Sequence, residues 1–114
     1  MTNQSDFPEV DWKTLRSLKS RLLGRASTRA LEHIEGIIRN READPHKAYF
    51  ELWHVLRSED EKIARMFDDM RRSNARLKLA EMIRFNLLTT EEIKTCTLET
   101  RSRVEELARV NKAL

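Results

Sequence analysis

The sequence predicts an all-α fold, and three observations lead to that prediction. Two glycines and two prolines among 114 residues are too few turn formers for a sandwich or barrel of short strands. Apolar residues recur every three or four positions, and no stretch alternates with a period of two. Apolar residues also make up 39% of the chain, which favours a folded domain over disorder. We expect a compact bundle of five to six helices in one domain over residues 11–114, preceded by a frayed N-terminus over residues 1–10.

The first part of the chain is predicted to form two helices separated by a glycine. Asp11 has the character of an N-cap, and apolar residues at helical spacing follow it as far as Leu22. Gly24 then stands where a glycine commonly ends a helix. A second apolar face begins after Ser27 and continues to Ile38. These signals predict a helix that ends or bends at Gly24 and a second helical stretch starting near Ser27.

The middle of the chain is predicted to contain a long central helix. The pair Asp44–Pro45 is an N-cap followed by proline at the first helical position, which starts a third helix. Ser58 and Glu61 have capping-box spacing, so the central helix is predicted over residues 59–88. Uninterrupted, it would be about 45 Å long at 1.5 Å per residue. It would project as an arm or pair with a second copy, unless the polar pair at residues 73–74 breaks it.

The C-terminal part has the spacing of a helix-turn-helix unit at about residues 89–107. Thr89 and Glu92 form a second capping-box pair before a short helix, and Thr97 is placed to cap the last helix. In a DNA-binding unit, the second helix would direct two arginines toward the major groove and the phosphates, with Val104 packed inward. These arginines are Arg101 and Arg103.

Charge is distributed unevenly, although the net charge is only +3. Residues 12–29 contain six basic residues and no acid, and a further basic cluster includes Arg71, Arg72, Arg76 and Lys78. Such clusters either build a positive surface or neutralise neighbouring acidic helices.

The lone Cys96 fits a reducing compartment, and the start of the chain lacks a secretory signal. We therefore expect a cytoplasmic protein with no membrane partner, since no apolar run could span a bilayer.

Motifs for catalysis are weak. Glu51 and His54 match the Glu-x-x-His spacing of di-metal bundles, but such a site needs a second motif and further carboxylates. Cys96 has no histidine near it in the sequence, and the chain has no glycine-rich phosphate loop, nucleophile elbow or Cys-x-x-Cys pair. The sequence therefore predicts no enzyme activity, no catalytic residue, no metal site and no cofactor.

The middle helices have more large apolar side chains than contact with one neighbouring helix would bury. The helix predicted over residues 59–88 therefore either lies in the middle of the protein's own bundle or is buried against a partner. The surface predicted for a partner consists of Met66, Met70, Leu79, Met82 and Phe85. We expect a non-catalytic regulatory protein that binds a macromolecule, most simply another protein, as a homodimer. The alternative is a DNA-binding regulator that uses residues 89–107 and the basic cluster. A metal- or nucleotide-dependent enzyme is the third reading.

Overall fold

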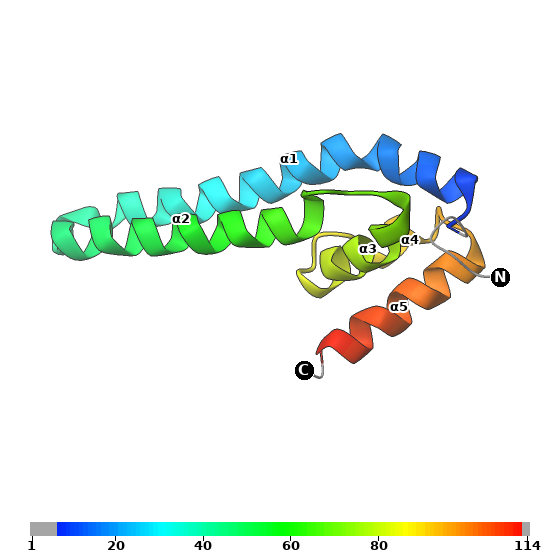
Figure 1. Ribbon diagram of the computed structural model, residues 1–114. Helices are drawn as coiled ribbons and strands as arrows, with labels where there is room; N and C mark the ends of the chain where they lie inside the picture. Colours follow the sequence, from blue (N-terminus) through cyan, green and yellow to red (C-terminus); the bar gives the residue numbers. More distant parts are fainter. Residues whose placement is uncertain (1–6, 113–114) are drawn as a thin grey trace.

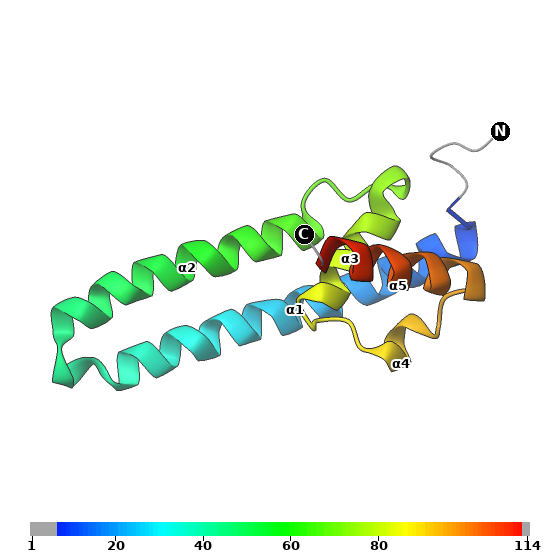
Figure 2. The ribbon, with the colours of Figure 1, turned by 90° about the horizontal axis from the view of Figure 1, so that it is seen from below.

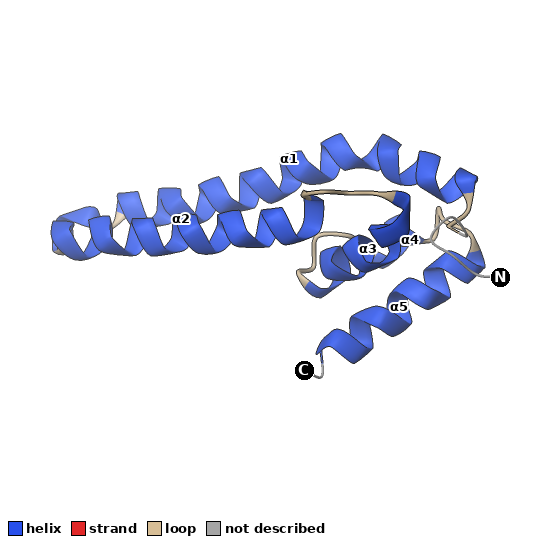
Figure 3. Cartoon of the chain, viewed as in Figure 1, coloured by secondary structure: helices blue, strands red, loops and turns tan. Residues whose placement is uncertain are grey.

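The computed structural model describes the backbone of residues 7–112 and the side chains of residues 7–110, and this part of the chain is all-α (Figures 1 and 3). The helices are α1 Glu9–Arg39, α2 Pro45–Phe67, α3 Ala75–Arg84, α4 Thr90–Ile93 and α5 Leu98–Lys112, with short 3-10 turns at Arg41–Ala43 and Arg72–Asn74. The predicted fold class is confirmed. The shape is elongated, 59 × 28 × 23 Å, because α1 and α2 form an antiparallel hairpin that extends beyond the other helices (Figure 2).

α1 is one long, bent helix of 31 residues, so of the two alternatives at Gly24 the one in which the helix ends there is wrong. Leu22 and Ala26 are both buried, which shows that the same face stays turned to the core on either side of the glycine. Gly24 itself is exposed, and a Cβ there would meet nothing within 4 Å. A glycine inside a helix costs about 1 kcal/mol relative to alanine. Burial of the leucine and alanine side chains around it outweighs that cost, so the helix continues.

α2 begins as predicted and ends later than predicted. The Asp44 carboxylate accepts a hydrogen bond from the Lys47 backbone N–H at 3.1 Å, and Pro45 occupies the first turn. The helix then runs through Ser58 without interruption, so the capping box proposed there is wrong. The predicted helix over residues 59–88 is broken between Phe67 and Ala75, a wider break than the pair at residues 73–74 alone.

The core lies where the first half of α1, the end of α2 and the three C-terminal helices meet. Its largest fully buried apolar side chains are Phe7, Leu15, Leu22, Leu79, Met82, Leu87, Ile93 and Val104. Phe7 is completely buried, so the folded part starts before the boundary predicted at residue 11, while residues 1–6 lie outside the described residues. Across residues 7–112, no helix has both the length and the apolar character needed to cross a membrane.

The C-terminal unit follows the predicted pattern. The Thr89 hydroxyl accepts a hydrogen bond from the Glu92 backbone N–H at 3.0 Å, and the Glu92 carboxylate accepts one from the Thr89 N–H at 3.0 Å. This capping box starts the single turn of α4, and a short connection leads to α5. Val104 is fully buried, as the helix-turn-helix spacing predicted.

Candidate functional site

The distal part of the α1–α2 hairpin, residues 31–60, is called the arm below. It extends away from α3, α4 and α5 (Figure 2). None of its residues is buried, although many are large and apolar. Two helices packed only on each other leave most of each apolar face in solvent, and a helix gains most of its stability when a neighbour covers that face. The arm is therefore a part of the described chain where several large apolar residues lie uncovered close together, whereas Val10, Leu77 and Leu98 are exposed singly elsewhere.

Several apolar residues of the arm lie on one of its two broad faces, although Phe50, which is also exposed, packs against His54 outside this set. A shallow groove there joins the two helices and is lined by Ile37, Ile38, Arg41, Pro45, Ala48, Tyr49 and Leu52. Tyr49, Trp53 and Leu56 follow at i, i+4 and i+7, which places them on one side of α2. Their exposed fractions are 63%, 54% and 42%. We call this side the apolar face; it consists of Leu31, Ile34, Ile38, Tyr49, Leu52, Trp53 and Leu56.

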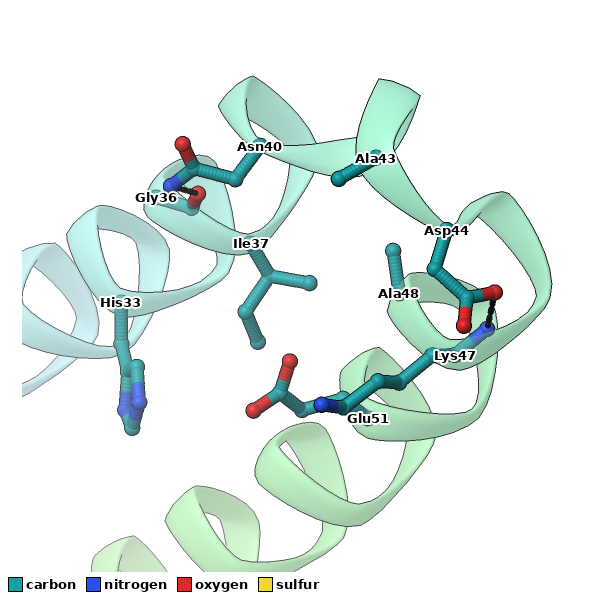
Figure 4. A pocket seen from close by; sticks show the side chains of 9 residues that line it. All are labelled: His33, Gly36, Ile37, Asn40, Ala43, Asp44, Lys47, Ala48 and Glu51. Atoms are coloured by element: carbon teal, nitrogen blue, oxygen red, sulfur yellow. Dashed lines mark hydrogen bonds between the residues drawn. The ribbon is translucent and has the colours of Figure 1, made fainter.

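The opposite side of the arm, called the polar face below, has charged and polar residues beside apolar ones. A hollow of about 430 Å³ lies there between the helices (Figure 4), lined by His33, Gly36, Ile37, Asn40, Ala43, Asp44, Lys47, Ala48 and Glu51. Glu51 lines this hollow, whereas the ring of His54 packs edge-on against Phe50 with centroids 4.4 Å apart. Among the described residues, no group of three or more His, Cys, Asp or Glu side chains could hold a metal ion.

Three of the five residues predicted as a partner surface belong to the protein's own core. Met66, Leu79 and Met82 are 3%, 1% and 0% exposed, and Met70 and Phe85 are half-buried against the same cluster. The sequence left open whether this region is central or meets a partner, and the structure shows it to be central. α3 packs against α2 on one side and against α5 on another. It therefore needs apolar residues around more of its circumference than a helix that contacts a single neighbour.

The predicted basic cluster is engaged within the chain. Arg72 donates hydrogen bonds to the Glu9 carboxylate at 2.8 Å and to the Phe7 carbonyl at 2.6 Å. Arg71 pairs with Asp69, the Arg76 guanidinium lies 5.4 Å from the Phe7 ring centre, and Lys78 Nζ donates to the Arg65 carbonyl at 2.9 Å. Within the described residues, Arg71 and Arg72 therefore pair with acids, and Arg72 also holds Phe7 and Glu9 at the start of the folded part.

The two arginines predicted to contact nucleic acid lie at the start of α5. Arg103 is exposed and Arg101 is half-buried. No hydrogen bond or ion pair engages either side chain in the described part of the chain. They differ in this respect from the cluster at residues 71–78.

Sequence reasoning assigned the wrong role to Asp11. α1 begins at Glu9, so Asp11 does not cap its own helix. Its carboxylate is completely buried and accepts hydrogen bonds from the Thr97 N–H at 2.8 Å, the Thr97 hydroxyl at 2.7 Å and the Thr100 hydroxyl at 2.5 Å. Asp11 therefore fastens the start of α5 to α1. A signal was available, because Asp11 shares the helical face of Leu15 and Leu22, where a carboxylate needs partners.

Burial and hydrogen bonding act oppositely on the pKa of Asp11. Burial by itself would raise this pKa, but the hydrogen bonds from Thr100 and Thr97 favour the carboxylate and together bring it below its ordinary value. The neighbouring Cys96 thiol has its pKa raised to about 11 by burial and by the Asp11 charge. Cys96 is thus a buried thiol at neutral pH, and a thiol is a poor nucleophile.

A second carboxylate joins α1 to α4. Arg25 donates two hydrogen bonds to Glu92, at 2.9 and 2.7 Å, and a third to the Leu87 carbonyl at 2.7 Å. The bonds from Arg25 lower the pKa of Glu92 to about 2, although burial opposes the shift. Both carboxylates with clearly shifted pKa values therefore have partners that hold helices together.

No family model, curated protein or solved structure matches this chain. The functional argument therefore depends on its own surfaces. Among the surfaces of the described residues, the apolar face of the arm and the arginines at the start of α5 are candidates for binding.

Proposed function

We propose that this chain is a non-catalytic binding protein that contacts another protein through the apolar face of the arm. The observation that carries the proposal is the position of seven apolar residues on one face of the arm, in which no residue is buried. A contiguous exposed apolar patch on a folded domain marks an interaction site. Tyrosine and tryptophan, which Tyr49 and Trp53 contribute, are among the residues that dominate binding energy at interfaces.

The rest of the molecule supports a role in binding over a role in catalysis. Asp11, Glu92 and Cys96 have shifted pKa values, and each has a structural explanation. A catalytic site would be expected to bring such groups to a cleft. Here Asp11 and Glu92 hold α1 to the C-terminal helices, and the Cys96 thiol is buried beside Asp11.

Binding of an apolar fluorescent dye tests whether the apolar face is accessible in the folded chain. We expect the native protein to bind the dye, and the double variant Leu31→Gln/Trp53→Gln to bind it at least about fivefold more weakly at an unchanged melting temperature. The matched control is the double variant His33→Gln/Lys47→Gln on the polar face, which should bind the dye like the native chain. Failure of the folded native chain to bind the dye would contradict the proposal.

DNA binding through α5 is a second candidate, supported by the observed α4–turn–α5 unit and the unengaged Arg101 and Arg103. Since two arginines give few phosphate contacts, we expect a fluorescently labelled duplex to bind weakly and only at low salt. An anisotropy titration at low and physiological salt measures this. Binding that survives physiological salt and is lost in Arg101→Ala/Arg103→Ala would make DNA the principal partner.

A further inference from the structure

We infer that the outward side of the first half of α1 binds the phosphate backbone of a double-stranded nucleic acid. This inference goes beyond the function proposed above, because it concerns a different surface and a different class of partner. α1 runs along the upper edge of the molecule in Figure 1, with the other helices below it. We call its outward side the basic face; it consists of Lys13, Arg16, Ser17, Lys19, Ser20 and Gly24. All of these residues are exposed except Lys19, which is half-buried.

Helical geometry places the basic face opposite the core. Leu15 and Leu22 are fully buried and mark the side of α1 that faces the other helices. Lys13 and Ser20 each precede one of these leucines by two residues, which is about 200° around an α-helix. They therefore point away from the core. Arg16 lies three residues after Lys13 and four before Ser20, so it shares their side.

The three cations of the basic face are not neutralised within the described part of the chain. None of them has a hydrogen bond or ion pair with a described residue, and residues 12–29 contain no acid. The two acids that precede them in α1 are engaged elsewhere, since Glu9 pairs with Arg72 and Asp11 accepts its hydrogen bonds from α5. Glu92 of α4 is held by Arg25. These three cations therefore form an exposed positive surface.

Charge is also separated along the molecule. The arm has seven acids against four Lys and Arg, a net charge of −3, whereas the rest of the chain has 18 Lys and Arg against 12 acids, a net charge of +6. Such a field attracts a polyanion to one end of the molecule and repels it from the other. A nucleic acid on the basic face would thus leave the arm free for a protein partner.

The chemistry and relief of the basic face suit a phosphate backbone. A duplex carries one negative charge per about 1.7 Å of its axis, so cations spread over about 9 Å of α1 can meet several phosphates. The small side chains at Ser17, Ser20 and Gly24 keep the face low, which lets a phosphate strand approach the helix. The Ser20 hydroxyl has no partner among the described residues, and serine hydroxyls commonly donate to phosphate oxygens. Core packing does not require glycine at Gly24, because a Cβ there would meet nothing within 4 Å.

Two other anionic partners fit this surface less well. Single-stranded nucleic acid is bound by stacking its bases on aromatic side chains, and the basic face has none. A membrane-surface helix buries its apolar side among the lipid headgroups. In α1 that side is already buried in the core at Leu15 and Leu22.

A fluorescence-anisotropy titration of the full chain with labelled DNA and RNA duplexes of one sequence tests the inference. We expect binding at low salt, and Lys13→Gln/Arg16→Gln/Lys19→Gln should weaken it at least about tenfold. For DNA, the loss of three phosphate contacts should also reduce the slope of log K against log salt by about 2.7. Binding to the backbone predicts that a second duplex sequence changes the dissociation constant by less than about twofold.

The matched control is Arg39→Gln/Arg41→Gln/Lys47→Gln, which removes the same number of positive charges from the arm. It should bind both duplexes like the native chain, and both triple variants should keep the native melting temperature. Equal losses in the two variants would show that only the net charge matters and would overturn the inference.

Three further results would overturn it. A folded native chain that binds neither duplex at low salt has no such site. A loss confined to Arg101→Ala/Arg103→Ala would place the contact on α5. Binding of vesicles made of phosphatidylcholine and phosphatidylserine, without binding of either duplex, would make a membrane surface the partner. Dye binding by the arm should be unchanged in the α1 variant, so failure of this inference leaves the proposed function standing.

Discussion

Replacing Met82 with lysine is expected to unfold the domain or to lower its free energy of unfolding by more than about 4 kcal/mol. Met82 is 0% exposed and lies in the cluster where α3 meets its neighbours. A lysine there must bury an unpaired ammonium group or push the helices apart, and the variant also loses the packing of the methionine. Urea unfolding followed by circular dichroism measures the effect.

Trp53→Lys is the matched comparison for Met82→Lys. Trp53 is 54% exposed and lies on the arm, so its replacement should change the free energy of unfolding of the single chain by less than about 1 kcal/mol. A folded, stable Met82→Lys protein would show that the α3 region is a surface, as the sequence alone allowed.

Replacing Asp11 with alanine should lower the free energy of unfolding by about 3–5 kcal/mol. Its carboxylate accepts three hydrogen bonds from Thr97 and Thr100, and all three donors lose their partner in the variant. Hydrogen bonds to a charged group are stronger than neutral ones, and the buried Thr100 hydroxyl would be left without a partner. Denaturant unfolding measures the loss, and amide hydrogen exchange should show it concentrated in the first turn of α5.

The control for this prediction is Thr14→Ala, three residues further along α1. The Thr14 hydroxyl donates to the Val10 carbonyl within its own helix, so its loss should cost less than about 1 kcal/mol. Thr100→Val should reproduce part of the Asp11→Ala effect, because it removes one of the three donors. Equal stabilities for native protein and Asp11→Ala would show that the contact between α1 and α5 contributes nothing to the fold.

The same carboxylates determine how stability should vary with pH. The folded-state pKa of Asp11 is lowered, and that of Glu92 is about 2. A group with a lowered folded-state pKa stabilises the native state above its unfolded pKa, near 4, and loses that contribution as the pH falls toward the folded value. Stability should thus be level near neutral pH and decline below about pH 4. The decline should be shallower in Asp11→Asn.

Local signals explain why some helix boundaries could be predicted from the sequence and others could not. Asp44–Pro45 and Thr89–Glu92 satisfy backbone groups within their own first turn, and the structure has both. Gly24 and Ser58 carry comparable signals, yet α1 and α2 run through them. Beside Gly24, the burial of Leu22 and Ala26 outweighs the cost of about 1 kcal/mol for a glycine in a helix, and a serine inside a helix costs less than a glycine.

The sequence by itself determined the all-α class, the sites of Asp44 and Thr89 as caps, and the presence of apolar faces, because these depend on residues within about four positions of each other. Only the tertiary structure decided which apolar faces are covered: Met82 is buried and Trp53 is exposed, although both lie at helical apolar positions. It also decided that Asp11 holds Thr97, 86 residues away along the chain. Periodicity shows that a face is apolar, but only the arrangement of helices in space shows which face has a neighbour.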